Sequence, residues 1–168
     1  TYKNPEQFSD GSILVIGSGS SGSQIAEELK RSNRDVFFSI GPHDRPPRRY
    51  RGRDNVWWLG VLGKWEAKTP NPGTQHVTIA VSGYDGGKTI DFRNLANMGI
   101  TLLGMTKGFR NEKIYFENDL KANIHNGDKN YLSLLDEADE YITNNNLDFS
   151  EEPEARQFEK DHECIKNP

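Results

Sequence analysis

A glycine-rich turn that directly follows a short apolar run is the feature that most limits what this chain can fold into. The run, residues 12–16, is bounded by glycines and predicts a strand buried on both faces, as in a parallel sheet. The turn reads Gly17-Ser18-Gly19-Ser20-Ser21-Gly22, and apolar residues at helical spacing follow it to about residue 32. A second apolar run at residues 35–40 completes the pattern of a βαβ unit.

This context predicts that the turn binds phosphate. Gly17 allows the sharp change from strand to helix, Gly19 lets the backbone approach a pyrophosphate, and Gly22 lets the helix pack closely on the strand. The free amides and the dipole at the start of the helix favour negative charge, and Ser20 and Ser21 add hydroxyl donors. We therefore expect a dinucleotide site here; the alternative is a plain glycine turn between strand and helix.

The end of the second strand indicates which dinucleotide is bound. An NAD site normally has Asp or Glu there, which accepts a hydrogen bond from the ribose 2′-OH. This chain has Ser39 and no carboxylate until Asp44, and we expect Asp35, at the start of the strand, to point away from the ribose. Five arginines follow within nine residues, and they are Arg45, Arg48, Arg49, Arg51 and Arg53. Such donors suit a 2′-phosphate, so we predict NADP; the alternative is a solvated basic loop paired with the acidic C-terminal segment.

The remaining segments predict an α/β fold. Trp57, Trp58 and Trp65 lie in a short helix at about residues 56–65, and we expect them to cover the sheet edge and brace the arginine loop. Further strands are expected at residues 77–81, 100–104 and 113–116, with the last paired to the segment before it. Helices are expected at residues 91–98, closed by Gly99, and at residues 119–144, with Gly127 as a weak point.

These elements predict a Rossmann-like, doubly wound, mainly parallel sheet. We assign residues 1–146 to this dinucleotide-binding domain. Residues 147–168 form an acidic C-terminal arm with few apolar residues, which we expect to be extended or partly disordered.

Composition excludes several other classes of protein. The net charge of −4 argues against a nucleic-acid binder, and no run approaches eighteen apolar residues, so no membrane span is expected. Cys164 is the single cysteine, which favours a reducing, cytoplasmic location. The four histidines lack the spacing of metal ligands.

The sequence resembles a known family in several blocks. Residues 2–8, followed by Val15 through Leu29 with the glycine turn, are similar to the start of the NADPH-binding region of flavin-containing monooxygenases, especially the bacterial flavoproteins of that superfamily. Residues 48–54 followed by Trp57-Trp58 are similar to a signature of the bacterial subgroup. The first residues contain neither an initiator methionine nor an apolar leader, which we interpret as a piece of a longer protein.

The resemblance implies an inserted NAD(P)-binding domain of a flavoprotein that binds two dinucleotides. NADPH would pass hydride to an FAD held by a separate FAD-binding domain of the parent chain, so we expect this piece to be inactive alone and nominate no catalytic or metal-binding residue. The candidate cofactor-binding residues are Gly17, Ser18, Gly19, Ser20, Ser21, Gly22, Gln24, Ser39, Arg45, Arg48, Arg49 and Arg51.

Two other functions remain open at this stage. One is a nucleotide-sensing regulatory module without redox chemistry. The other is a short-chain oxidoreductase acting alone, which is disfavoured because no Tyr-x-x-x-Lys pair follows the sheet.

Overall fold

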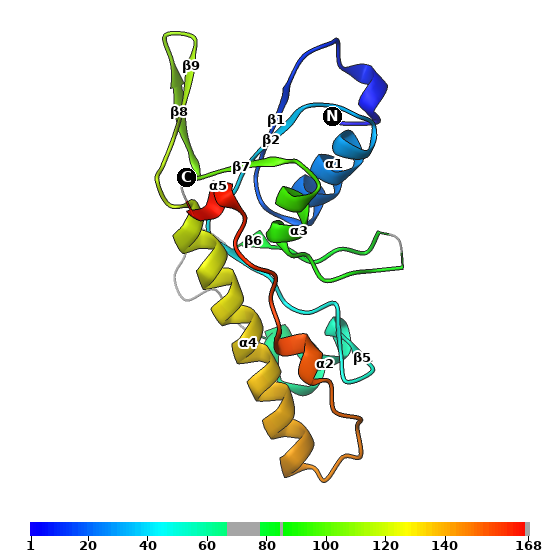
Figure 1. Cartoon of the computed structure of the whole chain (residues 1–168). Helices are drawn as coiled ribbons and strands as arrows, with labels where there is room; N and C mark the ends of the chain where they lie inside the picture. Colours follow the sequence, from blue (N-terminus) through cyan, green and yellow to red (C-terminus); the bar gives the residue numbers. More distant parts are fainter. Residues whose placement is uncertain (67–77, 85, 167–168) are drawn as a thin grey trace.

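The computed structural model describes residues 1–66, 78–84 and 86–166, and Figure 1 shows the arrangement of its elements. The α-helices are α1 (Ser20–Arg31), α2 (Asn55–Val61), α3 (Phe92–Asn97), α4 (Leu120–Asn144) and α5 (Glu163–Lys166). The strands are β1 (Ile13–Ile16), β2 (Val36–Ser39), β3 (His43–Asp44), β4 (Arg49–Tyr50), β5 (Arg53–Asp54), β6 (Thr78–Ile79), β7 (Thr101–Leu103), β8 (Thr106–Arg110) and β9 (Lys113–Phe116). Short 3-10 helices cover Pro5–Gln7, Lys64–Glu66 and Pro153–Arg156.

A three-stranded parallel sheet of order β1-β2-β7 is the centre of the fold. Ile13 pairs with Val36 across β1 and β2, and Phe38 pairs with Leu102 across β2 and β7. Helix α1 connects β1 to β2, which confirms the predicted βαβ unit. The mixed α/β class and the parallel pairing are therefore as expected.

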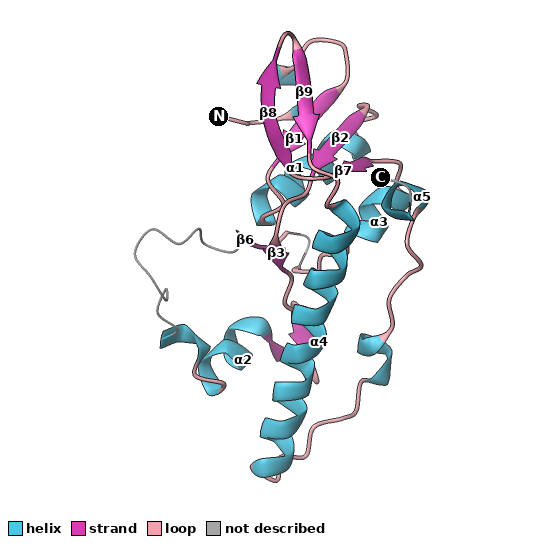
Figure 2. Cartoon of the chain, turned by 90° about the vertical axis from the view of Figure 1, so that its left-hand side faces the viewer, coloured by secondary structure: helices cyan, strands magenta, loops and turns pink. Residues whose placement is uncertain are grey.

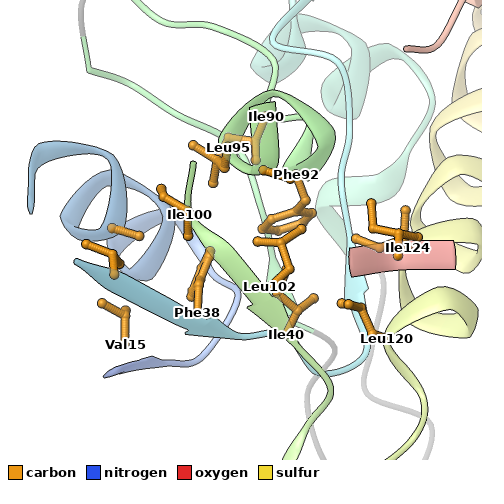
Figure 3. Packing of buried hydrophobic residues seen from close by; sticks show 14 of the residues in the cluster. Val15, Phe38, Ile40, Ile90, Phe92, Leu95, Ile100, Leu102, Leu120 and Ile124 are labelled. Carbon is orange, nitrogen blue, oxygen red and sulfur yellow. The ribbon is translucent and has the colours of Figure 1, made fainter. Parts of the chain in front are cut away.

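Only one face of this sheet carries the main core. Val15, Phe38 and Leu102 lie in one row of neighbouring strands, and all three are buried. Figure 3 shows Phe38 and Leu102 directed toward α3, and the Phe38 ring also lies 3.5 Å from the position that a Cβ on Gly22 of α1 would take. Ile16 is 61% exposed. The prediction that the first strand is buried on both faces is wrong at this end, because α1 and α3 both pack against the row that contains Phe38.

Helix α4 carries a second apolar cluster, away from the sheet (Figures 1 and 2). Trp58 packs against it together with Tyr50, and Trp58 Nε1 donates a hydrogen bond of 3.0 Å to the Tyr50 carbonyl oxygen. Trp58 therefore braces the arginine loop as expected. It does so against α4, however, and the expectation that the tryptophans cover the sheet edge is wrong for Trp57 and Trp58. Trp65 is largely exposed.

The elements after α3 follow the sequence pattern closely. Strands β8 and β9 pair antiparallel, and Asn111 and Glu112 make the turn between them with positive φ angles. This hairpin projects from the sheet in both views (Figures 1 and 2).

The strand predicted at residues 77–81, before α3, is shorter in the structure. Strand β6 contains Thr78 and Ile79, and residue 77 lies outside the described residues.

The C-terminal segment is extended and firmly held. It runs back along α4 to the sheet (Figure 1), where Ile165 of α5 is fully buried in the main core. Asp161 forms an ion pair with Arg93 of α3 and a hydrogen bond with His125 of α4, each at 2.8 Å. Burial raises the pKa of Asp161, but the hydrogen bonds from His125 and Arg93 outweigh burial and leave that pKa below its usual value.

We expect Asp161→Asn to destabilise the chain by about 1–3 kcal/mol, because the buried Arg93 side chain loses a charged acceptor. Folding lowers the pKa of Asp161 below its ordinary value of 3.8. The ionised carboxylate therefore stabilises the folded protein at pH values above 3.8. This stabilisation is lost as the pH falls through the lowered pKa of the folded state. The difference between the two proteins in urea unfolding should therefore shrink below about pH 4. Glu159→Gln, an exposed change in the same segment, is the control and should have no effect.

Gly127 is required by the packing of α4 against β3. A Cβ at this position would lie 2.5 Å from Nε2 of His43. The His43 ring cannot easily move, because it is buried, stacks edge-on against Phe92 at 4.7 Å and binds the Gly41 carbonyl oxygen through Nδ1 at 2.9 Å. Burial also lowers the pKa of His43. Gly127, which we expected to be a weak point of the helix, is thus the position where α4 contacts His43 of β3.

Gly127→Ala should destabilise the protein by about 1–3 kcal/mol through overpacking, although alanine in a helix is usually about 1 kcal/mol better than glycine. Chemical unfolding of the full chain measures the effect. In a His43→Ala background the same change should become neutral or stabilising. A stabilised Gly127→Ala single variant would contradict this account of the contact.

Candidate functional site

The glycine turn has the geometry that its sequence indicates. Gly17 follows β1 with φ of +107°, and its amide continues the ladder to β2 by donating to the Ser39 carbonyl oxygen at 3.3 Å. A Cβ on Gly22 would lie 1.9 Å from the Gly17 carbonyl oxygen. Glycine is therefore needed at position 17 for its backbone conformation and at position 22 for the close contact of helix and strand.

The first turn of α1 offers free donors. Gly19 is the N-cap residue and makes no side-chain cap. The backbone amides of Ser20, Ser21 and Gly22 donate to no acceptor among the described residues. The helix dipole adds positive potential at the same place. This arrangement can bind an anion such as a phosphate group.

Strand β6 lies against one side of the turn, a contact that no local sequence pattern predicts. Ser20 Oγ donates to the Ile79 carbonyl oxygen at 3.2 Å and accepts from the Val81 amide at 3.3 Å. A Cβ on Gly19 would lie 2.9 Å from Cγ2 of Thr78. The Ser20 hydroxyl therefore positions β6, and the close approach at Gly19 involves a segment of the chain itself.

Three of the other candidate side chains are also engaged in internal contacts. The buried Ser39 hydroxyl donates to the Gly104 carbonyl oxygen at 2.9 Å and accepts from Thr106 Oγ1 at 2.8 Å. Ser18 is buried beside the Gly41 carbonyl oxygen. Gln24 Nε2 donates to Ser82 Oγ at 3.2 Å. Ser39 thus connects β2 to the start of β8.

Arg45 is a structural residue. It is 2% exposed, and its Nη2 lies 2.7 Å from Oδ1 of Asp128 on α4. Its guanidinium also lies over the rings of Tyr131 and Phe158, at 4.7 and 4.9 Å from their centres. A buried cation with these partners has no face left for a phosphate.

The other arginines of the cluster do not gather at the glycine turn. Arg48 pairs with Asp54 at 2.9 Å, and Arg51 pairs with Asp139 at 2.8 Å. The Arg51 guanidinium also donates to the Phe149 carbonyl oxygen of the C-terminal segment at 3.3 Å. These two side chains thus pair with acidic residues, but their partners lie in β5 and α4 and not in the acidic C-terminal segment, which Arg51 contacts through the Phe149 carbonyl oxygen.

Arg49 differs from its neighbours. It is exposed, and it donates to the carbonyl oxygens of Gly86 and Gly87 rather than to a carboxylate. Ser82, close to these glycines in sequence, contacts Gln24 of α1. Of the cluster residues predicted to bind the cofactor, Arg49 is the one whose guanidinium meets no carboxylate in the described part of the chain.

Two other kinds of site find no support in the described residues. No group of three or more His, Cys, Asp or Glu side chains among them is arranged to hold a metal ion. None of the helices that the structure describes combines the length and apolar character of a membrane span.

Comparison with known proteins connects the site to one family. Residues 1–43 match the family model of flavin-binding monooxygenase-like proteins. A CzcO-like oxidoreductase of Geobacillus kaustophilus is 43% identical over 63 residues, which cover 37% of this chain and 18% of that protein. The dimethylaniline monooxygenase 2 of Macaca mulatta is 55% identical over 38 residues, covering 23% of this chain and 7% of the relative.

The matched region contains β1, the glycine turn, α1 and β2. Another relative, the oxidoreductase CzcO of Bacillus subtilis, is 37% identical over 70 residues and is also covered over 18% of its length. No solved structure matches the chain. The chain is therefore related to flavin-binding monooxygenase-like oxidoreductases, and the matched segment spans less than a fifth of these relatives.

Gly22→Ala should destabilise the chain by about 3 kcal/mol, because the new methyl group meets a backbone carbonyl that cannot move independently of β1. Urea unfolding followed by circular dichroism measures the loss. Gly83→Ala is the matched control, since a Cβ there meets nothing within 4 Å. Equal stabilities of the two variants would show that the turn is looser than described.

Proposed function

We propose that this chain holds NADPH for a flavin-dependent oxidoreductase, with the pyrophosphate on the glycine turn. The observation that supports this most is the first turn of α1, where three backbone amides have no acceptor among the described residues and Gly17 and Gly22 bring strand and helix together. These residues lie inside the segment that matches the flavin-binding monooxygenase-like family. Residues Gly17 to Gly22 would hold the phosphates, with Gln24 beside them.

The proposed preference for NADPH rests on the missing carboxylate at the end of β2 and on Arg49 of β4. No carboxylate lies between Val36 and His43, so the acidic residue that normally accepts from the ribose 2′-OH in an NAD site is absent there. Asp35 is at the opposite end of the strand, where its Oδ2 accepts from Ser12 Oγ at 2.6 Å. We assign the 2′-phosphate to Arg49, because its exposed guanidinium is bound by carbonyl oxygens that a phosphate can replace.

The chemistry would belong to the larger flavoprotein. NADPH, when bound, supplies a hydride to FAD, which a separate FAD-binding domain would hold. The residues of this chain bind and orient the dinucleotide, and none is assigned as acid, base or nucleophile. The single cysteine, a free thiol whose pKa is raised by burial, suits a cytoplasmic location.

Calorimetric titration of the full chain with NADPH and NADH tests the proposal. We expect NADPH to bind at least tenfold more tightly than NADH, which corresponds to about 1.4 kcal/mol. Arg49→Ala should weaken NADPH binding and leave NADH binding unchanged. Arg53→Ala is the control, because Arg53 is an exposed neighbour that stacks over Phe149. Equal affinities for the two cofactors would refute the assignment of the 2′-phosphate.

A second pair of variants tests the turn itself without a folding defect. Thr78→Ser removes the methyl group that a Cβ at position 19 would meet. In this background Gly19→Ala should fold normally but bind both dinucleotides at least tenfold more weakly, since the new methyl group meets the pyrophosphate. Unchanged affinity in the double variant would exclude the turn as the phosphate site.

A further inference from the structure

Strand β6 lies in the space that the glycine turn would need for a pyrophosphate. In a dinucleotide site the second glycine of the turn has no side chain, so that the pyrophosphate can approach its backbone. In this chain a Cβ on Gly19 would lie 2.9 Å from Cγ2 of Thr78 and 3.9 Å from the Ile79 carbonyl oxygen. The space beside Gly19 is therefore filled by the two residues of β6.

The Ile79 carbonyl oxygen is also unfavourable for an anion at this position. It is the negative end of its peptide dipole, and Ser20 Oγ donates to it at 3.2 Å. The same Oγ accepts from the Val81 amide at 3.3 Å. Because a hydroxyl group has a single proton, Ser20 has none to donate to a phosphate oxygen while β6 is in place.

The two residues of β6 are held less firmly than the residues that follow them. Strand β6 pairs with β3 through Thr78 and Ile79, and Ile79 is 52% exposed. A two-stranded pair adds little stability by itself. Ala80, in contrast, is fully buried in the main core, and the buried Ser82 accepts a hydrogen bond from Gln24 of α1. Thr78 and Ile79 can therefore leave the turn while Ala80 and Ser82 stay in place.

We propose that β6 covers the pyrophosphate position of the turn and that a dinucleotide binds by displacing Thr78 and Ile79. Because the site is the same turn, this inference rests on the proposed function. The cost of moving the strand lowers the measured affinity. The amides in the first turn of α1, which donate to no acceptor among the described residues, offset this cost when they bind the phosphates.

The role of the Ser20 hydroxyl follows from this arrangement. It is a positioning group that holds β6 against the turn, because both of its hydrogen bonds go to the segment around Ala80. Loss of this hydroxyl should consequently strengthen dinucleotide binding. A hydroxyl that bound phosphate directly would have the opposite effect, so the sign of the change separates the two roles.

Nuclear Overhauser spectroscopy of the full chain tests the displacement directly. The Thr78 methyl group should show a contact with the α protons of Gly19. Saturation with NADPH should remove this contact, while the Ala80 methyl group keeps its contacts with the core. NADH has the same pyrophosphate and should have the same effect at saturation, so the result does not depend on Arg49. Adenosine 2′-monophosphate, which has no pyrophosphate, should leave the contact in place.

Calorimetric titration tests the role of Ser20. Ser20→Ala should bind NADPH about threefold more tightly or better, which is the effect of one ordinary hydrogen bond. Ser32→Ala, which changes an exposed serine at the other end of α1, is the matched control and should leave the affinity unchanged.

The outcomes separate this inference from the proposed function. The inference alone would be overturned if the Thr78–Gly19 contact persisted at NADPH saturation or was also lost with adenosine 2′-monophosphate. Equal or weaker NADPH binding by Ser20→Ala, or an equal gain in Ser32→Ala, would have the same meaning. NADPH binding by Ser20→Ala alone would support the inference. Absence of NADPH binding to both the unchanged chain and Ser20→Ala would overturn the inference and the proposed function together.

Discussion

The carboxylate of Asp128 connects the main core around the sheet with the second apolar cluster on α4. It lies in the middle of α4 and binds Arg45 from the loop after β2 and Arg93 from α3, each at 2.7 Å. Both arginines are buried. Removal of the Asp128 carboxylate would leave Arg45 without a carboxylate partner inside the protein, while Arg93 would keep Asp161 and Asp91. Burial raises the pKa of Asp128, but the two arginines outweigh burial and leave the pKa lowered. The main core around the sheet and the second cluster on α4 meet at this residue.

Local pattern was sufficient to predict the longer elements, but not the two-residue strands β3, β4 and β5 or the short helix α5. The βαβ unit, the β8–β9 hairpin and the long helix α4 each follow from apolar spacing and turn residues that lie within one short window. The one-sided core was not predictable in this way, since which row of the sheet is covered depends on where α3 packs. Ile16 illustrates this, because it sits in an apolar run and is nevertheless exposed.

The parts of the candidate site that depend on backbone conformation could be predicted from the sequence. The parts that depend on which side chains pair with one another could not. Gly17 and Gly22 have the roles that their spacing implies, because those roles are set within a few residues. The arginines look alike in sequence. Arg45, however, pairs inside the protein with the carboxylate of Asp128, which is 83 residues away. Nothing near Arg45 in the sequence distinguishes it from Arg49. The contact of β6 with Ser20 could not be predicted for the same reason, because Ser20 and Ile79 are 59 residues apart.

The position of Ile165 has a consequence for how the chain is made. This residue, in α5, is fully buried in the same apolar cluster as β1, α1 and β2. A ribosome releases the strands of the sheet before it releases α5, so the cluster stays open on one side until α5 has emerged. Until α5 has emerged, the strands of the sheet and α1 therefore keep part of their apolar surface exposed. Synthesis of the strands and closing of the core are thus separated in time, and α5, which follows the strands in the sequence, completes the cluster.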